Sequence, residues 1–330
     1  MPGQGKVTIR QVAEAAGVST ATVSLVYNDK GEVAASTRER VLEVGARLGY
    51  RPGWMSKAFR TGRTRVIGVV VGHSSTQIWE LTYLPYYRGI IAGAAMEALE
   101  HGYSITAVPV GGTATGLDGP IAPDGVIVVD PAPNDPLVES ALESGLAVVS
   151  AGGYSGAAES PRLRSVRLDI HRGVPAGLDA LVASGATRPA FFRGSVDDEY
   201  TTGSQAAYEG WCAARGRDPL VFVLPPGRDP LDGARGLISG EFGPCDAAYC
   251  INETYASAVT IAAAEALISI PESFAVSVVA ETRAASDPRL VYLDLDPIEL
   301  GAQCARILID ILEGRSPDDG WLPIRLEAQR

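Results

Sequence analysis

Cysteine and histidine, the residues that build most disulfide frameworks and transition-metal sites, are scarce in this chain of 330 residues. Its four cysteines form no C-x-x-C pair, and its three histidines are far apart in the sequence. We therefore expect neither a metal site nor a disulfide framework, and we predict a location in the reducing cytoplasm.

Long apolar segments are also missing. The longest apolar stretches, residues 66–71 and 256–268, are short or contain polar residues, whereas a transmembrane helix needs about 20 apolar residues in a row. Residues 1–17 lack the apolar core of a secretory signal. Neither membrane insertion nor secretion is expected.

The common catalytic and phosphate-binding motifs are absent as well. Residues 111–116 (GGTATG) lack the spacing of G-x-G-x-x-G, and no lysine follows Lys57 to complete G-x-x-x-x-G-K-[ST]. No serine stands in a G-x-S-x-G turn, and the histidines have no motif partners nearby. We predict that the chain is not an enzyme and needs no cofactor.

Basic residues are concentrated at the N-terminal end. Residues 1–65 hold 11 basic and 5 acidic side chains, a net charge of +6, whereas residues 66–330 hold 17 and 34, a net charge of −17. This asymmetry indicates a basic nucleic-acid-binding module joined to an acidic body. The alternative is a chance clustering of surface charge.

The first 50 residues contain the signals of three helices. Thr8 and Gln11 form a capping box, and Gly17 permits the left-handed backbone that ends a helix. Ser19 caps a second helix, 20–27, with Val23 and Val26 facing inward. A second capping box, Ser36 with Glu39, opens a third helix to about residue 48 whose inner face carries Val41, Leu42 and Leu48. Two helices joined by a tight glycine-containing turn predict a helix-turn-helix.

At these residues the sequence resembles the LacI/GalR (lactose-repressor) family of bacterial transcription regulators. The match runs through VTIRQVAEAAGVSTATVSLVYN and STRERVLEVGARLGYRP. The resemblance implies that the second helix enters the major groove of operator DNA. Base edges would face Thr20, Ala21 and Leu25. Phosphates or the helix frame would be held by Ser19, Thr22, Ser24 and Asn28, and the contacting set also includes Thr8, Arg10 and Tyr50.

Two of the reading positions differ from the family pattern. Leu25 stands where most members have arginine, and Ala21 replaces a residue that is frequently polar. Arginine donates paired hydrogen bonds to guanine, whereas leucine and alanine offer apolar contacts, for instance to thymine methyl groups. We expect an operator that differs from the common family site. Loss of DNA binding is the alternative.

Residues 1–51 are the predicted DNA-binding domain, and residues 52–65 are the predicted hinge. The resemblance implies that the hinge becomes helical when two subunits meet on the operator, with an apolar side chain inserted in the minor groove. Phe59 occupies that position, where leucine is usual. The alternative is that Phe59 packs on the body.

From residue 66 onward, strands alternate with helices. The run 66–71 (VIGVVV) is typical of a strand buried on both faces, and the alternation restarts after residue 166. This pattern predicts parallel sheets in two similar lobes with a cleft between them.

The resemblance extends over the body and implies two doubly wound α/β lobes like those of periplasmic sugar-binding proteins. The chain would cross between lobes near residues 160–166, 286–293 and 318–323. The first lobe would comprise about 66–162 and 291–320, and the second about 163–290 and 321–330. The resemblance also implies a homodimer formed through both lobes and a small effector in the cleft.

The candidate effector residues are Tyr86, Tyr87, Ala207, Asn252, Glu253 and Thr282. Many family members hold a sugar with an arginine three residues before a Gly-aromatic pair, where this chain has Ala207. Thr282 replaces the aspartate that completes this clamp, and Asn252-Glu253 stands for the usual Asn-Asp pair. Without the Arg–Asp clamp a standard sugar is disfavoured. The tyrosines would stack on a ring-bearing ligand or pack within the lobe.

These observations predict a cytoplasmic, homodimeric, sequence-specific DNA-binding regulator, a repressor gated by a small molecule such as a sugar or related metabolite. Its partners would be double-stranded operator DNA and the effector, with no membrane. The alternative is a small-molecule-binding protein whose DNA-binding domain is inactive.

Overall fold

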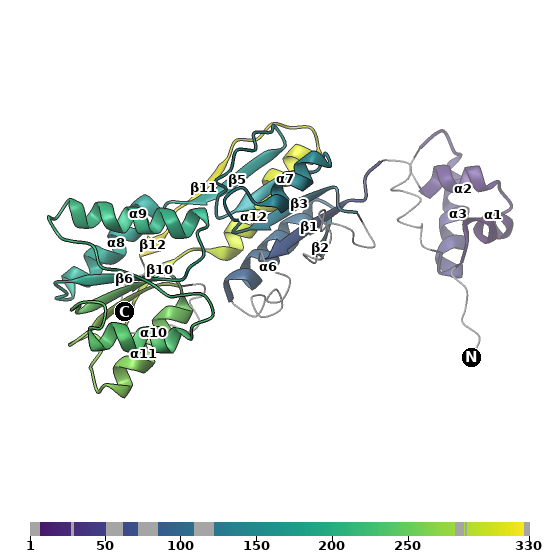
Figure 1. Cartoon of the computed structure of the whole chain (residues 1–330). Coiled ribbons are helices and arrows are strands. Elements are labelled where there is room, and N and C mark those ends of the chain that lie inside the picture. Colours follow the sequence, from purple (N-terminus) through teal and green to yellow (C-terminus); the bar gives the residue numbers. More distant parts are fainter. Residues whose placement is uncertain are drawn as a thin grey trace. The chain divides into compact units, whose positions relative to one another are not determined.

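The computed structural model describes residues 7–27, 30–50, 62–71, 85–108, 122–280, 287 and 289–326. The chain divides into two compact units, residues 1–64 and 65–330. We call them the head and the body and describe each separately (Figure 1). No helix within the described ranges is both long and apolar enough to cross a membrane.

The head contains three helices, α1 (Ile9–Ala16), α2 (Thr20–Tyr27) and α3 (Ala35–Leu48). As predicted, α1 begins with a capping box between Thr8 and Gln11 and ends at Gly17, whose φ of 63° is left-handed. The Ser19 hydroxyl accepts a hydrogen bond from the Thr22 backbone N–H at 3.0 Å at the start of α2. The predicted helix-turn-helix is confirmed.

The head has a small core of its own, and of the three α3 residues predicted to face it, Val41 is buried whereas Leu42 and Leu48 are not. The predicted capping box of Ser36 and Glu39 is wrong, because α3 starts at Ala35 and its N-cap residue, Ala34, makes no side-chain hydrogen bond. Leu42 and Leu48 are 43% and 37% exposed. The packing of Tyr27 decides which face of α3 is buried. A Cβ on Gly45 would lie 1.7 Å from the Tyr27 hydroxyl oxygen, so glycine at this position leaves room for Tyr27. The buried core is Val12, Ala13, Ala16, Val23, Val26, Val41 and Val44.

The body contains two six-stranded sheets (Figure 1). The first has the order β11-β5-β4-β3-β1-β2 and is parallel throughout. Its strands are β1 (Val66–Val71), β2 (Ser104–Ala107), β3 (Gly125–Val129), β4 (Ala147–Ala151), β5 (Leu163–Leu168) and β11 (Gly320–Leu322). Strand β1 is buried along its whole length, as its β-branched sequence predicts.

The second sheet has the order β12-β10-β9-β8-β6-β7 and is parallel except where β12 pairs with β10. Its strands are β6 (Pro189–Arg193), β7 (Val221–Val223), β8 (Ala247–Cys250), β9 (Ala275–Ala280), β10 (Val291–Asp294) and β12 (Arg325–Leu326). The predicted two-lobed α/β body with parallel sheets is confirmed.

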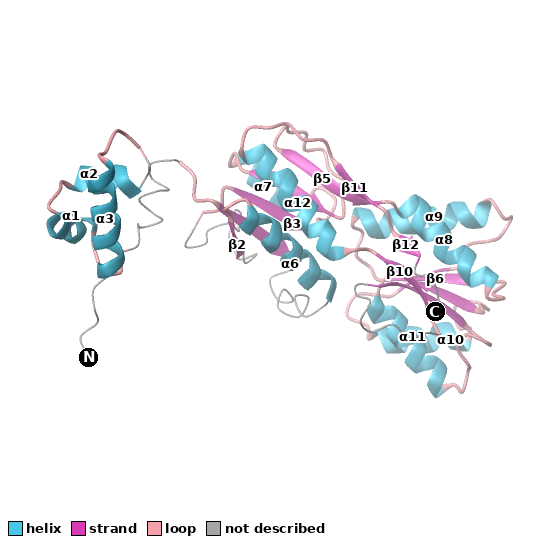
Figure 2. Ribbon diagram, turned by 180° about the vertical axis from the view of Figure 1, so that it is seen from behind, coloured by secondary structure: helices cyan, strands magenta, loops and turns pink. Residues whose placement is uncertain are grey.

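Helices cover both faces of each sheet (Figure 2). The first sheet packs on α6 (Pro85–Glu100) and α12 (Pro297–Leu312) with one face and on α7 (Pro136–Glu143) with the other. The second sheet packs on α8 (Ile170–Ala183) and α9 (Glu199–Ala213) with one face. Its other face packs on α10 (Pro230–Ser239) and α11 (Glu253–Glu265). A continuous apolar core runs from the α6–α12 side of the first lobe to the α8–α9 side of the second.

The chain crosses between the lobes later than predicted. Strand β5 belongs to the first sheet and β10 to the second, so the predicted boundaries at 163 and 291 are wrong by one strand each. Strand β11 likewise completes the first sheet before the last crossing. Each segment must run the full length of its strand to pair with its neighbours, and it can change lobes only after the strand ends.

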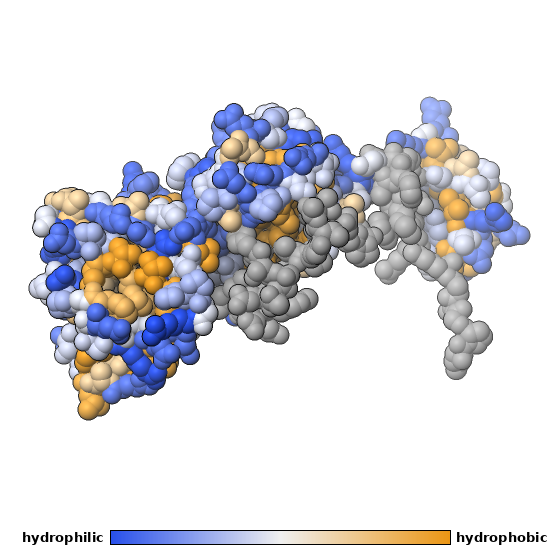
Figure 3. Space-filling model, viewed as in Figure 1, coloured by the Kyte–Doolittle hydropathy of each residue, from blue (hydrophilic) through white to orange (hydrophobic). Residues whose placement is uncertain are grey.

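Exposed apolar side chains on the head include Leu25, Leu42 and Leu48, and Figure 3 shows apolar spots on its otherwise polar surface. On the body, Figure 3 shows an apolar patch on the second lobe between α9 and α10. Strand β7 is an edge strand of this lobe, and its last residue, Val223, is 41% exposed.

Candidate DNA-binding face and effector cleft

Helix α2 exposes both polar and apolar side chains on the side opposite its buried face. Val23 and Val26 are buried in the head core, whereas Thr20 and Ala21 are exposed and Leu25 is 39% exposed. A helix has 3.6 residues per turn, so these three exposed positions share one side. The structure therefore brings together the three residues predicted to face base edges.

The residues predicted to hold phosphates flank that face. The hydroxyls of Ser19 and Thr22 lie 2.9 Å apart, and Ser19 and Arg10 are exposed. Thr8 is exposed and caps α1. Ser24 is half-buried in α2. The exposed hydroxyls of Ser19 and Thr8 already form local hydrogen bonds, which fixes their rotamers at the helix starts.

Tyr50 is half-buried and packs edge-to-face on Tyr27, with ring centroids 5.2 Å apart. Burial raises the pKa of the Tyr50 hydroxyl, and the neighbouring Tyr27 adds to the effect. Tyr50 thus contributes to the head core, and its predicted DNA contact stays a prediction. Asn28 and Phe59 lie outside the described residues, so the predictions for them stay open.

The cleft between the lobes is lined by residues from several strand ends. An inner pocket of about 110 Å³ is bounded by Tyr86, Tyr87, Asp130, Asp198, Tyr200, Thr201, Ile251, Asn252, Val279 and Leu295. Small-molecule sites usually enclose about 300–1,000 Å³. In this arrangement the inner pocket is smaller than such sites usually are.

Tyr86 and Tyr87 form the aromatic wall of the inner pocket. Their rings meet edge-to-face with centroids 5.2 Å apart. The buried Tyr86 hydroxyl donates to Asp130 Oδ1 at 3.3 Å. Burial, followed by the charge of Asp130, raises the pKa of Tyr86 well above its ordinary value. The phenol therefore remains a hydrogen-bond donor at any physiological pH.

The start of α9 supplies the opposite wall. Asp198 is buried and caps the helix, accepting hydrogen bonds from the Thr201 backbone N–H at 2.7 Å and from its hydroxyl at 3.0 Å. The Tyr200 hydroxyl donates to the Ile251 carbonyl at 3.2 Å, which ties α9 to the end of β8. The Asp198 cap therefore starts α9 at Glu199.

Three of the six predicted effector residues meet in the inner pocket: Tyr86, Tyr87 and Asn252. Asn252 also caps α11, accepting hydrogen bonds from the N–H groups of Thr254 and Tyr255. Ala207 instead packs against the core of the body on the inner side of α9. Glu253 lines a different groove, beside β9 and β10, because it follows Asn252 into the first turn of α11. Thr282 lies outside the described residues.

Asp130, Asp198, Tyr200 and Thr201 were missed by sequence reasoning. Asp130 directly follows β3, and the other three follow β6 after a short loop. Ligands in doubly wound sheets bind at the carboxyl ends of the strands, so the position of these residues was the available signal. Among the described residues, no group of three or more His, Cys, Asp or Glu side chains could hold a metal ion.

An ion pair joins the two lobes beside the cleft. Arg167 on β5 of the first lobe donates through Nε to Glu199 Oε1 on α9 of the second lobe, at 2.7 Å. Its Nη1 donates to Asp319 at the same distance. Glu199 lies close against Gly153, where a Cβ would come within 2.5 Å of its carboxyl carbon. The ion pair between Arg167 and Glu199 therefore depends on the present arrangement of the two lobes.

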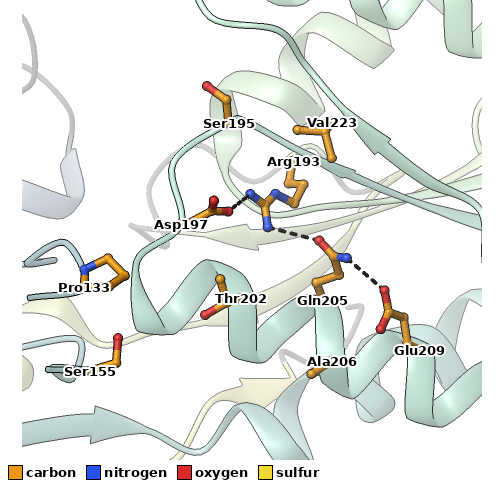
Figure 4. A pocket seen from close by; sticks show the side chains of 10 residues that line it. All are labelled: Pro133, Ser155, Arg193, Ser195, Asp197, Thr202, Gln205, Ala206, Glu209 and Val223. Carbon is orange, nitrogen blue, oxygen red and sulfur yellow. Dashed lines mark hydrogen bonds and ion pairs between the residues drawn. The ribbon is translucent and has the colours of Figure 1, made fainter. Parts of the chain in front are cut away.

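A second, outer pocket of about 630 Å³ lies at the same boundary (Figure 4). Its first-lobe wall is Pro133 and Ser155, and its second-lobe wall comes from the end of β6 and from α9. Arg193, the last residue of β6, is 5% exposed and joins Asp197 and Gln205 in a chain of hydrogen bonds. The consecutive residues Asp197 and Asp198 line the outer and the inner pocket respectively.

Part of each unit matches a known protein family. Residues 8–53 match the family of bacterial regulatory proteins named lacI, and residues 178–326 match a periplasmic binding protein-like domain. Residues 8–53 thus carry a lacI-family helix-turn-helix domain, and residues 178–326 carry a periplasmic binding protein-like domain. The resemblance inferred from the helix-turn-helix residues is confirmed.

Relatives with these features are transcriptional regulators. The chain is 39% identical to the HTH-type transcriptional regulator PtxS of Pseudomonas aeruginosa over 106 residues, which are 32% of this chain and 29% of PtxS. It is 25% identical to the HTH-type transcriptional regulator CelR of Thermobifida fusca over 97% of this chain and 94% of CelR. The alignment with PtxS thus spans less than a third of that relative. These relatives agree with the prediction that the chain is not an enzyme.

Solved structures share the fold along the whole chain. The Lac repressor dimer bound to operator and the anti-inducer ONPF superposes with a TM-score of 0.83 at 21% identity, covering 98% of each chain. This likeness places the head and the two-lobed body in the fold of a lacI-family regulator.

Proposed function

We propose that this protein is a dimeric, sequence-specific DNA-binding transcriptional repressor whose operator affinity is controlled by a small molecule bound between the two lobes. The observation that carries the proposal is the outer face of α2, where Thr20, Ala21 and Leu25 stand exposed on a folded helix-turn-helix. A recognition helix reads base edges with such a face. The protein would act in the cytoplasm, where operator DNA is accessible.

Dimer formation is part of the proposal. Both lobes expose large apolar side chains: Met96 and Leu99 on α6 are 53% and 69% exposed, and Ile261 on α11 is 50% exposed. Exposed apolar side chains on both lobes support association through both. Two heads held together would bind two half-sites of one operator.

The proposed control by a small molecule is a coupling between lobe arrangement and DNA affinity. The Arg167–Glu199 ion pair and the small inner pocket belong to one lobe arrangement. A ligand that widens the cleft would favour a different arrangement, and a ligand that bridges the lobes would favour this one. A ligand shifts the equilibrium only by its difference in affinity for the two arrangements.

The decisive experiment is a gel shift with the full chain and the DNA upstream of its own gene. We expect a specific complex that survives an excess of unrelated DNA. The competing function, a ligand-binding protein whose head is inactive, predicts no complex beyond that formed with unrelated DNA. A small molecule that binds the body without any effect on a specific complex would overturn control by the cleft.

Leu25→Arg is expected to change the preferred operator. Leucine offers an apolar contact, whereas arginine donates two hydrogen bonds to guanine and would add roughly 1–3 kcal/mol of discrimination at one base pair. Selection from randomised half-sites should therefore gain guanine at one position. Leu42→Arg is the matched control, because Leu42 is similarly exposed but lies on α3. An unchanged motif for Leu25→Arg would show that residue 25 does not face the bases.

A further inference from the structure

Helix α2 ends in an apolar side chain that the fold of the head already holds in place. Leu25, in the last turn of α2, is 39% exposed, yet part of its side chain lies against Gly31 in the loop before α3. A Cβ on Gly31 would lie 3.3 and 3.5 Å from the two methyl carbons of Leu25. Because residue 31 is a glycine, the leucine side chain packs directly on the backbone of the loop.

Hydrogen bonds to the last carbonyl groups of α2 hold the same turn. The Lys30 backbone N–H donates to the Leu25 carbonyl at 3.1 Å, and Arg38 Nη1 on α3 donates to the Val26 carbonyl at 3.4 Å. Such bonds satisfy carbonyl groups that the end of a helix otherwise leaves without a partner. The position of the Leu25 side chain is therefore set before DNA arrives, which lowers the entropy that binding costs.

A second apolar side chain shares the exposed side of α2 with Leu25. Ala21 is exposed and precedes Leu25 by four residues, so the two side chains lie on one face, about 6 Å apart along the helix axis. Neither side chain has a hydrogen-bond donor or acceptor. A polar base edge pressed against them would lose its hydrogen bonds to water without any replacement.

We propose that Ala21 and Leu25 read the C5-methyl groups of two pyrimidines in each operator half-site, which are thymines in unmodified DNA. Base pairs are stacked about 3.4 Å apart, so side chains separated by about 6 Å reach methyl groups within roughly two base pairs of each other. The inference rests on the proposed function, because it takes α2 as the helix that enters the major groove.

The other base edges fit these two side chains poorly. In the major groove guanine presents two acceptors, adenine an acceptor and a donor, and cytosine a donor, whereas thymine adds an apolar methyl group to its acceptor. Only the methyl group gains from contact with leucine or alanine. Hydrogen-bonded reading on this side of α2 falls to Thr20, whose exposed hydroxyl group both donates and accepts.

The test removes single methyl groups from the DNA without changing any base-pairing group. Selection from randomised half-sites with the full chain first identifies the preferred operator. Each thymine of the half-site is then replaced, one at a time, by deoxyuridine, which lacks only the C5-methyl group. Fluorescence anisotropy measures the affinity of the full chain for each duplex. The variants are Leu25→Ala and Ala21→Gly, and Leu42→Ala is the control, because Leu42 is similarly exposed but lies on α3.

We expect two thymines of the half-site, within roughly two base pairs of each other, to be sensitive to this replacement. Each loss of a methyl group should weaken binding by about fourfold, the effect of one buried methylene-sized group. Leu25→Ala should abolish the sensitivity at one of the two thymines, and Ala21→Gly should abolish it at the other. Leu42→Ala should retain both. A general loss of affinity or of helix stability cancels when the two duplexes are compared within one variant.

A second measurement returns the methyl group to a different base. Cytosine in place of the thymine that faces Leu25 should weaken binding, and 5-methylcytosine at the same position should recover about fourfold, because it restores only the methyl group. In Leu25→Ala, cytosine and 5-methylcytosine should bind equally.

Two results would overturn the inference: a specific half-site without methyl-sensitive thymines, or a sensitivity that Leu25→Ala and Ala21→Gly both leave unchanged. Either result leaves the proposed function intact, because the chain still selects a specific operator. Failure of the proposed function has a different signature. The selection would then yield no preferred half-site at all, and both the regulatory function and this mode of reading would be lost.

Discussion

Gly301→Val is expected to destabilise the body by at least about 3 kcal/mol, because overpacking a rigid contact has a cost of this order. Gly301 lies on α12 where this helix crosses α6, and a Cβ there would lie 2.0 Å from the backbone carbonyl oxygen of Ile90. Gly93 on α6 makes the reciprocal approach, since its Cβ would lie 1.8 Å from the Ile298 carbonyl oxygen. Neither contact can be relieved by rotating a side chain, so the two helices would have to separate.

Thermal unfolding followed by circular dichroism measures this effect. A loss of that size should lower the midpoint of the body transition by roughly 10 °C. Gly210→Ala is the matched control, because Gly210 is also helical and a Cβ there would meet no other atom within 4 Å. Alanine there should be neutral or stabilise by about 0.5–1 kcal/mol. Equal midpoints for Gly301→Val and the natural chain would show that α6 and α12 do not approach as closely as described.

Operator affinity is expected to fall by about a thousandfold or more between 50 and 200 mM salt, as it does for proteins that make several phosphate contacts. The physical reason is the division of charge: residues 1–65 carry a net charge of +6, and residues 66–330 carry −17. Basic side chains of the head would release counterions from DNA, whereas the acidic body is repelled by it. Fluorescence anisotropy with labelled operator across a salt series measures the slope.

The isolated residues 1–65 provide a comparison. They contain the complete head core, so the fragment should keep a steep salt slope while binding far more weakly than the dimer, which gains from two linked half-sites. Affinity that is insensitive to salt would contradict the assignment of the head as a phosphate-contacting module. Equal affinity of the fragment and the full chain would contradict the dimer.

The helices of the head could be predicted closely because their signals are local. Thr8 meets Gln11 and Ser19 meets Thr22 within a single helical turn, so the contacts that start α1 and α2 are specified by residues three positions apart. The predicted capping box at Ser36 is wrong because α3 starts one residue before it, at Ala35. The face that α3 buries depends on Tyr27, which comes from another helix. Contacts between helices depend on packing, so the residues near Ser36 in the sequence do not predict them.

The cleft also combines features that local sequence predicts with features that depend on contacts between distant segments. Strand alternation along residues 66–330 was enough to predict parallel sheets and two lobes, and the tyrosines at 86 and 87 do line the inner pocket. Asp130 and Asp198 lie 68 positions apart in the sequence and meet only because the carboxyl ends of β3 and β6 face one boundary. Ala207, at the position where many family members have an arginine, packs against the core. The arginine that lines the outer pocket is instead Arg193, at the end of β6.

Caps, turns and the period of apolar residues decide where this chain forms helices and strands, and the basic N-terminal segment decides which unit can approach DNA. The tertiary structure alone decides the lobe in which β5, β10 and β11 pair. It also decides that α6 and α12 touch through glycines, and that a buried arginine and an exposed aspartate share one pocket. The reason is physical: hydrogen bonds within one turn depend on neighbouring residues, whereas strand pairing and close packing depend on segments that only the folded chain brings together.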